Sequence, residues 1–274
     1  MLNCLDAWSG EVTPIAEYTN DGDSLTISMQ LSGEDAAMIA IANDGWSSKA
    51  IENCVAETTA DGVVYDESAE SNVSLRATEA GEYSVTFADG TEKTVTVDAA
   101  EEAILLTDWR MILNQWTEET DTEDPFDTRV VPTDEYDLSE TGLVPWYEID
   151  SENLTKVAGV ASYTTSFELE KGWEEGQGAY LEFTDISDIG RLYVNGQEVA
   201  MNQISLRADI GKYLTAGTNT IEVLVSSNLS NIKYAVDGES WWYGPYTAES
   251  CTYVFGIIGD VTLTPYTYTA INLD

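Results

Sequence analysis

Short segments of alternating apolar and polar residues, each bounded by turn residues, dominate the chain between residues 160 and 266. In Ile221, Val223 and Val225 every second residue is apolar, which is the pattern of a strand with one buried face. Asn195–Gly196 separates two such segments and favours the tight type I′ turn of a β-hairpin. Turn signals recur at intervals of roughly ten residues, which is typical of β-sandwiches. The sequence therefore predicts an all-β protein.

The same alternation predicts which side chains face the core. In the segment 163–169 we expect one face to hold Tyr163, Thr165, Phe167 and Leu169, and in the segment 179–183 we expect Ala179, Leu181 and Phe183 to point inward.

The segment 103–116 is ambiguous, because its apolar residues fit two periods. Leu105, Ile112 and Trp116, together with Trp109, fit a helix, whereas Trp109, Met111 and Leu113 fit a strand. We favour the strand because the neighbouring segments are all-β. No βαβ alternation long enough for a TIM barrel is present in the sequence.

These segments carry a family resemblance. The order ASYTTSFEL, RLYVNGQEV and FGIIGDVTLTPY resembles the galactose-binding-like jelly roll, of the family 2 sugar-binding type, found in large bacterial glycoside hydrolases. Near the start, AWSGEVTPIAEY is similar to a passage of α-L-rhamnosidase-like enzymes. The resemblance implies tandem β-sandwiches ending in a jelly roll, in the non-catalytic C-terminal region of such an enzyme.

We expect three units along the chain. Residues 1–45 are read as the end of a truncated β domain, 46–100 as a small immunoglobulin-like β-sandwich connector, and 101–274 as the galactose-binding-like jelly roll. In the connector, Asp89–Gly90 predicts a hairpin turn. In the first unit, residues 25–31 alternate like a half-buried strand, and residues 36–42 read as a buried strand.

The resemblance also implies a function, with one alternative. The implied role is an accessory or carbohydrate-binding region of a secreted hydrolase that acts on plant or host glycans, at an extracellular or cell-surface location. Its partner would be a polysaccharide or oligosaccharide, or the parent enzyme's catalytic domain. The alternative is a protein-binding or adhesin-like surface module without sugar affinity.

Charge and composition exclude several other functions. Fifty acids against eleven bases leave a net charge of −39, so nucleic acid, which needs Lys and Arg on its phosphates, is not an expected partner. An acidic polymer would be repelled unless a local basic patch or Ca²⁺ intervened. No run of 18 uncharged apolar residues is present, so we expect no membrane insertion. Histidine is absent, which removes Ser-His-Asp and Cys-His catalysis and the commonest zinc ligand.

Aromatic residues gather in the segment 237–255, which we read as a loop insertion between two strands. Sugars stack their CH-rich faces on aromatic rings, and their hydroxyls need nearby acceptors. The predicted sugar-binding residues are Trp241, Trp242, Tyr243 and Tyr246, with Asp237 and Glu239 as acceptors. The alternative, which the large area of aromatic side chains favours, is that the cluster fills the core or docks onto a neighbouring domain.

Other residues give weaker signals for a metal, sugar or catalytic site. Asp185 and Asp188 lie three apart and would suit a structural Ca²⁺ together with backbone carbonyls. Trp8 and Trp173 are isolated in the sequence, and we read them as packing residues rather than sugar platforms. No pair of acids stands out among fifty, so no catalytic residue and no other cofactor is predicted, and the chain itself is not expected to be an enzyme. Three widely spaced cysteines predict free or buried thiols.

Overall fold

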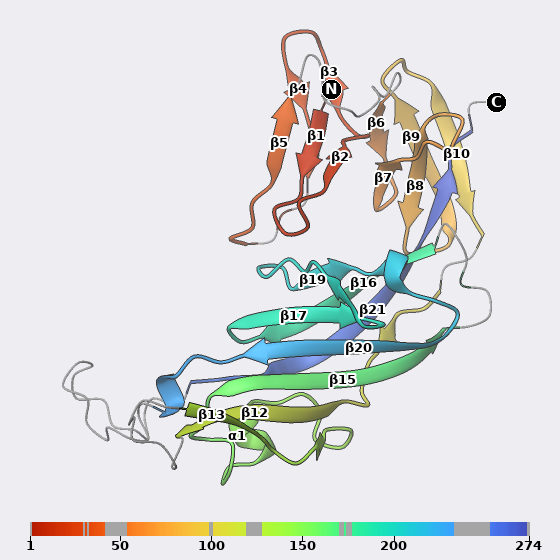
Figure 1. The fold of residues 1–274 in the computed structure, drawn as a ribbon. Coiled ribbons are helices and arrows are strands. Elements are labelled where there is room, and N and C mark those ends of the chain that lie inside the picture. Colours follow the sequence, from red (N-terminus) through yellow and green to blue (C-terminus); the bar gives the residue numbers. More distant parts are fainter. Residues whose placement is uncertain are drawn as a thin grey trace.

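The computed structural model describes residues 2–29, 31, 33–41, 54–98, 101–118, 128–169, 173, 177–232 and 253–272. The fold is built of β-sheets, which confirms the predicted all-β class. A large β-sandwich forms the lower part of the molecule in Figure 1, and two smaller groups of strands lie above it. The described residues include the short α-helix α1 (Trp146–Ile149) and no helix long and apolar enough to cross a membrane.

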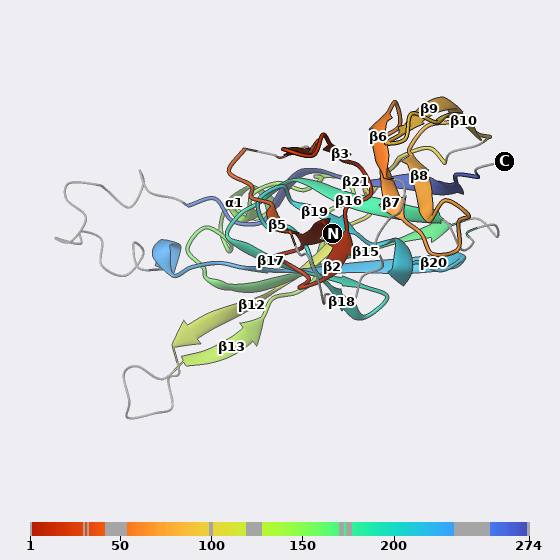
Figure 2. The ribbon, with the colours of Figure 1, turned by 90° about the horizontal axis from the view of Figure 1, so that it is seen from above.

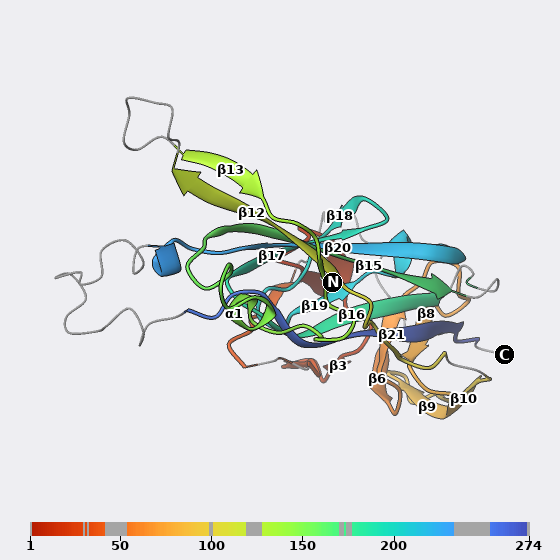
Figure 3. The ribbon, with the colours of Figure 1, turned by 90° about the horizontal axis from the view of Figure 1, so that it is seen from below.

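The large sandwich consists of two antiparallel sheets. One sheet has the order β13-β12-β15-β20-β17-β18, with β14 paired to β12. Its strands are β12 (Arg110–Glu118), β13 (Thr128–Pro132), β14 (Tyr136–Asp137), β15 (Gly159–Leu169), β17 (Ile189–Val194), β18 (Gln197–Val199) and β20 (Gly217–Ser226). The hairpin of β12 and β13 projects from the body of the sandwich (Figures 2 and 3).

The second sheet has the order β19-β16-β21-β8-β7, with β11 paired to β21. Its strands are β7 (Gly62–Tyr65), β8 (Val73–Ala77), β11 (Ile104–Leu105), β16 (Gln177–Ile186), β19 (Arg207–Asp209) and β21 (Ile257–Ala270). The short 3-10 helix η1 (Gly211–Tyr213) follows β19. One core cluster contains side chains from both sheets, so the sheets pack face to face.

The alternation predicted from the sequence determines this core. Tyr163, Thr165, Phe167 and Leu169 are all buried, as are the three apolar residues of β20 named above. The ambiguous segment contains β11 and, from Arg110, β12 rather than a helix, and Trp109, Met111 and Leu113 are all buried, as the period-2 prediction requires. The Asn195–Gly196 hairpin is also confirmed, because both residues have positive φ and join β17 to β18.

The last strand of the chain ties the large sandwich to a smaller one. At Thr267–Ala270, β21 leaves β16 and pairs with β8. β8 faces a three-stranded sheet of β6 (Val55–Thr58), β9 (Gly81–Phe87) and β10 (Glu92–Val97), and Ile271 is buried in the core between them. The predicted hairpin at Asp89–Gly90 joins β9 to β10. The sheet is therefore continuous from the large sandwich into the small one, while the division of the chain into domains at residues 45 and 100 stays a prediction.

The first unit departs from expectation in burial. Its sheet has the order β2-β1-β5, with β1 (Leu2–Leu5), β2 (Val12–Pro14) and β5 (Met38–Ile41), and a separate ribbon pairs β3 (Thr19–Asn20) with β4 (Leu25–Thr26). The segment 36–42 does contain a strand, but Met38 is 48% and Ile41 67% exposed, so its predicted burial is wrong. The half-buried strand expected at 25–31 is also wrong, because β4 is two residues long and Leu25 is exposed. Neither core cluster includes β4 or β5, since among the described residues no second sheet packs on them.

Candidate functional site

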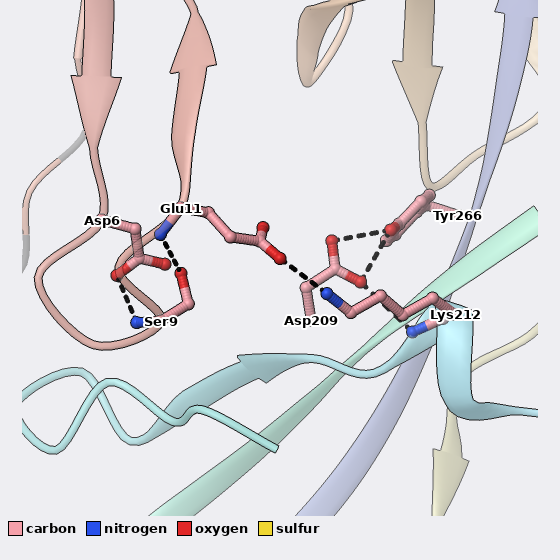
Figure 4. A network of polar contacts seen from close by, with 7 residues as sticks. Asp6, Ser9, Glu11, Asp209, Lys212 and Tyr266 are labelled. Carbon is pink, nitrogen blue, oxygen red and sulfur yellow. Dashed lines mark hydrogen bonds and ion pairs between the residues drawn. The ribbon is translucent and has the colours of Figure 1, made fainter. Parts of the chain in front are cut away.

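A cleft of about 1130 Å³ lies between the first unit and one end of the large sandwich. One wall is the loop 6–11, which joins β1 to β2 (Figure 4). The Asp6 carboxylate accepts hydrogen bonds from the backbone N–H groups of Trp8 and Ser9, at 2.8 and 3.4 Å. Gly10, at φ 74°, supplies the left-handed residue that the turn requires. This closed loop presents Trp8 with 41% of its surface exposed.

The opposite wall is formed by β18, β19, η1 and β21. At the start of η1, Gly211 packs so closely on β16 that an added Cβ would lie 2.6 Å from the Cα of Gly178. This close approach positions Lys212 and Tyr213 at the cleft. Lys212 Nζ donates a hydrogen bond to Glu11 Oε1 at 2.8 Å across the cleft, and this bond raises the pKa of the lysine. The ion pair links two parts of the chain that are distant in the sequence.

The floor of the cleft holds a tyrosine–carboxylate pair. Tyr266 Oη lies 2.8 Å from each carboxylate oxygen of Asp209 and donates its proton to that group (Figure 4). Tyr268 Oη donates to Tyr266 Oη at 3.3 Å, and Gly211 N–H donates to Asp209 Oδ1 at 3.2 Å. Burial, reinforced by the nearby Asp209 charge, raises the pKa of Tyr266, so the phenol keeps its proton and stays a donor.

The cleft combines aromatic rings with carboxylate groups. Trp8, Tyr213 and Trp173 supply aromatic rings from three different parts of the fold, and Trp173 packs on the core as well. Asp209 and Glu198 supply exposed carboxylate acceptors. Apolar ring faces beside a few fixed polar groups are what a small-molecule site requires, and carboxylates accept hydrogen bonds from hydroxyl groups.

The tryptophans show what the sequence missed. Trp146 is buried, and its Nε1 donates a hydrogen bond to Tyr163 Oη at 2.8 Å. Trp8 and Trp173, which we read as packing residues, both line the cleft. No local signal joins them, because the cleft arises only when the first unit lies against the sandwich. Trp46 lies outside the described residues.

The predicted aromatic cluster is not among the described residues. This applies to Trp241, Trp242, Tyr243 and Tyr246 and to both acceptors, Asp237 and Glu239, so their sugar contact stays a prediction. The structure does describe the two flanks of the segment. Asn231 Nδ2 donates to the carbonyl of Tyr253 at 3.1 Å, and Tyr253 N–H donates to Asn231 Oδ1 at 2.8 Å. These two bonds hold the flanks together.

The predicted calcium residues are exposed at the turn between β16 and β17. Asp188 has φ 64°, and its Oδ2 accepts two hydrogen bonds from Asn228, each 3.1 Å long. Asp185 lies on β16 opposite Ile258. The described part of the chain contains no group of three or more acids or cysteines placed to hold a metal ion. Calcium binding here stays a prediction. Cys4 and Cys54 are free thiols, as expected.

The fold and the cleft define the class of the protein, a two-sheet antiparallel β-sandwich with an aromatic, acid-lined cleft at one end. Residues 107–250 match the family described as "Glycosyl hydrolases family 2, sugar binding domain". The match spans more than half of the chain, and the chain therefore belongs to this family.

The individual proteins that resemble this chain share only part of its length or a low sequence identity with it. The β-galactosidase of Kluyveromyces lactis is 34% identical over 97 residues, which make up 34% of this chain and 9% of that protein. A rhamnosidase from Novosphingobium sp. PP1Y is similar over 78% of this chain and 22% of its own, with 17% identity and a TM-score of 0.43. A β-glucuronidase from Bifidobacterium dentium is similar over 62% and 30%, with 19% identity and a TM-score of 0.36. The chain thus spans only a small part of each of these proteins.

Proposed function

We propose that this chain is a non-catalytic, carbohydrate-binding accessory region of a secreted glycoside hydrolase, and that its saccharide binds in the cleft between the loop 6–11 and β19. The observation that carries the proposal is the placement of Trp8 and Tyr213 beside the carboxylate of Asp209 in one cleft. Family membership supports the sugar-binding role, and the short span of the chain relative to its relatives supports a role as part of a larger enzyme.

The proposal extends to the setting of the protein. We expect an α-L-rhamnosidase-like parent enzyme, an extracellular or cell-surface location, plant or host glycans as ligands, and the parent's catalytic domain as a further partner. The net charge of −39 suits a soluble surface protein. The cleft could bind a neutral oligosaccharide whatever the parent enzyme, the location or the source of the glycan. Each of these expectations therefore needs a test of its own.

A protein-binding or adhesin-like role is the second candidate, because one observation favours it. Ile39 and Ile41 are exposed apolar residues on one face of β5, and Met38 is exposed on the other. Exposed apolar patches mark contact surfaces. This role predicts affinity for a protein and none for glycans.

The test is calorimetric titration of the full chain with neutral rhamnose- and galactose-containing oligosaccharides. We expect Trp8→Ala to weaken binding about tenfold or more, because an exposed aromatic platform supplies much of the contact energy. Trp116→Ala is the matched control, since Trp116 is 40% exposed on the projecting hairpin and lines no part of the cleft. Equal losses of affinity in both variants, or no binding by the unmodified chain, would refute the proposed site.

A further inference from the structure

Two arginines approach one tyrosine ring beside the cleft. The guanidinium carbon of Arg207, on β19, lies 3.6 Å from the ring centroid of Tyr180, and that of Arg76, on β8, lies 5.4 Å from it. Arg76 is also 5.9 Å from the ring centroid of Tyr266. Both arginines line a second hollow of about 1290 Å³. They are the basic side chains among the residues that line this hollow, which is also lined by seven acids: Asp6, Glu11, Glu17, Asp35, Asp61, Asp66 and Asp209.

The second hollow is continuous with the cleft. Both are lined by Trp8, Asp209 and Tyr268, so the two form one groove, with the arginines beyond the aromatic part. A saccharide of several units bound in the cleft would extend along this groove toward Arg76.

The two arginines differ in their partners. Arg207 Nε pairs with Glu182 Oε1 at 3.3 Å. Arg76 is half-buried and contacts the two tyrosine rings, but among the described residues no carboxylate lies within ion-pair distance of it. A guanidinium is always charged and carries five N–H donors. Removing it partly from water without an anionic partner is unfavourable, so Arg76 is set up to receive an anion.

Three acids of the same hollow accept hydrogen bonds from neutral donors. The Asp66 carboxylate accepts from the hydroxyl of Ser74 at 2.5 Å. Asp61 accepts from the N–H and hydroxyl of Thr78, at 2.6 and 2.7 Å. The carboxylate of Asp35 accepts from the amide of Asn202 at 2.9 Å. These bonds fix the positions of the three carboxylates, and none of the three forms an ion pair with Arg76.

We propose that Arg76, supported by Arg207, forms a subsite for the carboxylate of an acidic sugar in the groove. A planar guanidinium matches a carboxylate with two parallel hydrogen bonds, which favours a uronate over a neutral hexose. The paired hydrogen bonds act at contact distance, where they offset the repulsion between the saccharide carboxylate and the acids that also line the hollow. The inference rests on the proposed saccharide cleft and names the sugar class that its extension takes.

The test compares trigalacturonate with its methyl ester, which has the same shape without the charge. Titrations of the full chain are run with a chelator, so that no calcium bridges the carboxylates, and at about 150 mM salt, where the Debye length of about 8 Å screens the distant acids. We expect the acid form to bind about tenfold more tightly than the ester, the usual effect of a hydrogen bond to a charged group. A trisaccharide of neutral sugars that carries one sulfate group should bind no better than the ester.

Two variants and one control locate the effect. Arg76→Gln should abolish the preference for the acid and leave affinity for the ester unchanged, and Arg76→Lys, which keeps the charge, should retain part of the preference. Arg191→Gln, which removes the same charge from an exposed site on β17 outside both hollows, should change neither. Circular dichroism checks that each variant is folded.

The outcomes separate this inference from the proposed function. Binding of both trisaccharides with equal affinity refutes the arginine subsite and leaves the saccharide cleft standing. A preference that survives in Arg76→Gln likewise overturns the assignment to Arg76. Tight binding of the sulfated probe refutes the carboxylate specificity. Failure of every trisaccharide to bind refutes both proposals.

Discussion

Replacing Gly178 by alanine tests whether the floor of the cleft is as tightly packed as the structure indicates. A Cβ added at Gly178 would lie 2.1 Å from Cζ and 2.2 Å from Oη of Tyr266, where ordinary contact begins at 3.4 Å. The ring must therefore move by about 1.3 Å, the difference between these distances. Tyr266 is only 4% exposed, and the rings of Tyr180 and Tyr268 lie 4.8 and 5.0 Å from its centroid. It has little room to move.

Two energy terms give the expected magnitude. Forcing an extra methyl group into a packed site costs about 1–3 kcal/mol. Displacing the Tyr266 hydroxyl from Asp209 adds roughly 1 kcal/mol, a low value because Asp209 is exposed and water replaces the lost donor. The sum of about 2–4 kcal/mol corresponds to a fall in Tm of about 4–7 °C for a chain of this size, at an unfolding entropy of about 2.1 cal/mol/K per residue.

Urea denaturation followed by tryptophan fluorescence measures the loss. Gly33→Ala is the matched control, since an added Cβ there meets no atom within 4 Å, and we expect it to be neutral or slightly stabilising. In Tyr266→Ala, which removes the ring, the further change Gly178→Ala should cost almost nothing. If Gly178→Ala has wild-type stability, or if its cost is the same with and without the Tyr266 ring, the reasoning from packing is wrong.

Three further changes test other parts of the fold. Tyr163→Phe leaves the buried Nε1 of Trp146 without the acceptor now at 2.8 Å, and should lower the free energy of unfolding by about 1–3 kcal/mol in urea titrations; a value near zero would count against the bond. Ile271→Ala should lower the free energy of unfolding by about 2–5 kcal/mol, because this side chain fills the core of the small sandwich. Amide hydrogen exchange should speed up in β8 and β9 more than in the strands of the large sandwich. Hydrogen bonds, the strongest from the Ser68 hydroxyl, hold the pKa of Asp66 below its ordinary value. The ionised Asp66 therefore stabilises the fold at pH values above that ordinary pKa, and this stabilisation is lost as the pH falls through the lower pKa of the folded state. In acid titrations Asp66→Asn should lose less stability than the wild type.

Sequence reasoning succeeded where neighbouring residues determine the structure. The two faces of β15 and the choice of strand for β12 follow from alternation, because side chains in a strand point to opposite sides at every second residue. It failed for β5, whose apolar residues predicted burial. An apolar strand is buried only if another layer covers it, and alternation within the strand carries no information about that layer.

For the candidate site, too, the sequence predicted what depends on neighbouring residues and missed what depends on distant ones. The sequence drew attention to residues 237–246 because their aromatic side chains are adjacent along the chain. The cleft depends instead on contacts such as Lys212 to Glu11, whose residues are 201 positions apart. Pairs at this separation leave no pattern in a single sequence.

Taken alone, the sequence determined the all-β class, the tight turn at Asn195–Gly196, the net charge of −39 and the absence of histidine chemistry. These properties depend on composition or on interactions within a few residues. Only the tertiary structure decided that β21 continues from the large sandwich into the small one, and that Trp8, Arg76 and Tyr266 line one groove. Both features arise from the packing of strands that are distant in the chain, where the shape of the folded core sets which side chains meet.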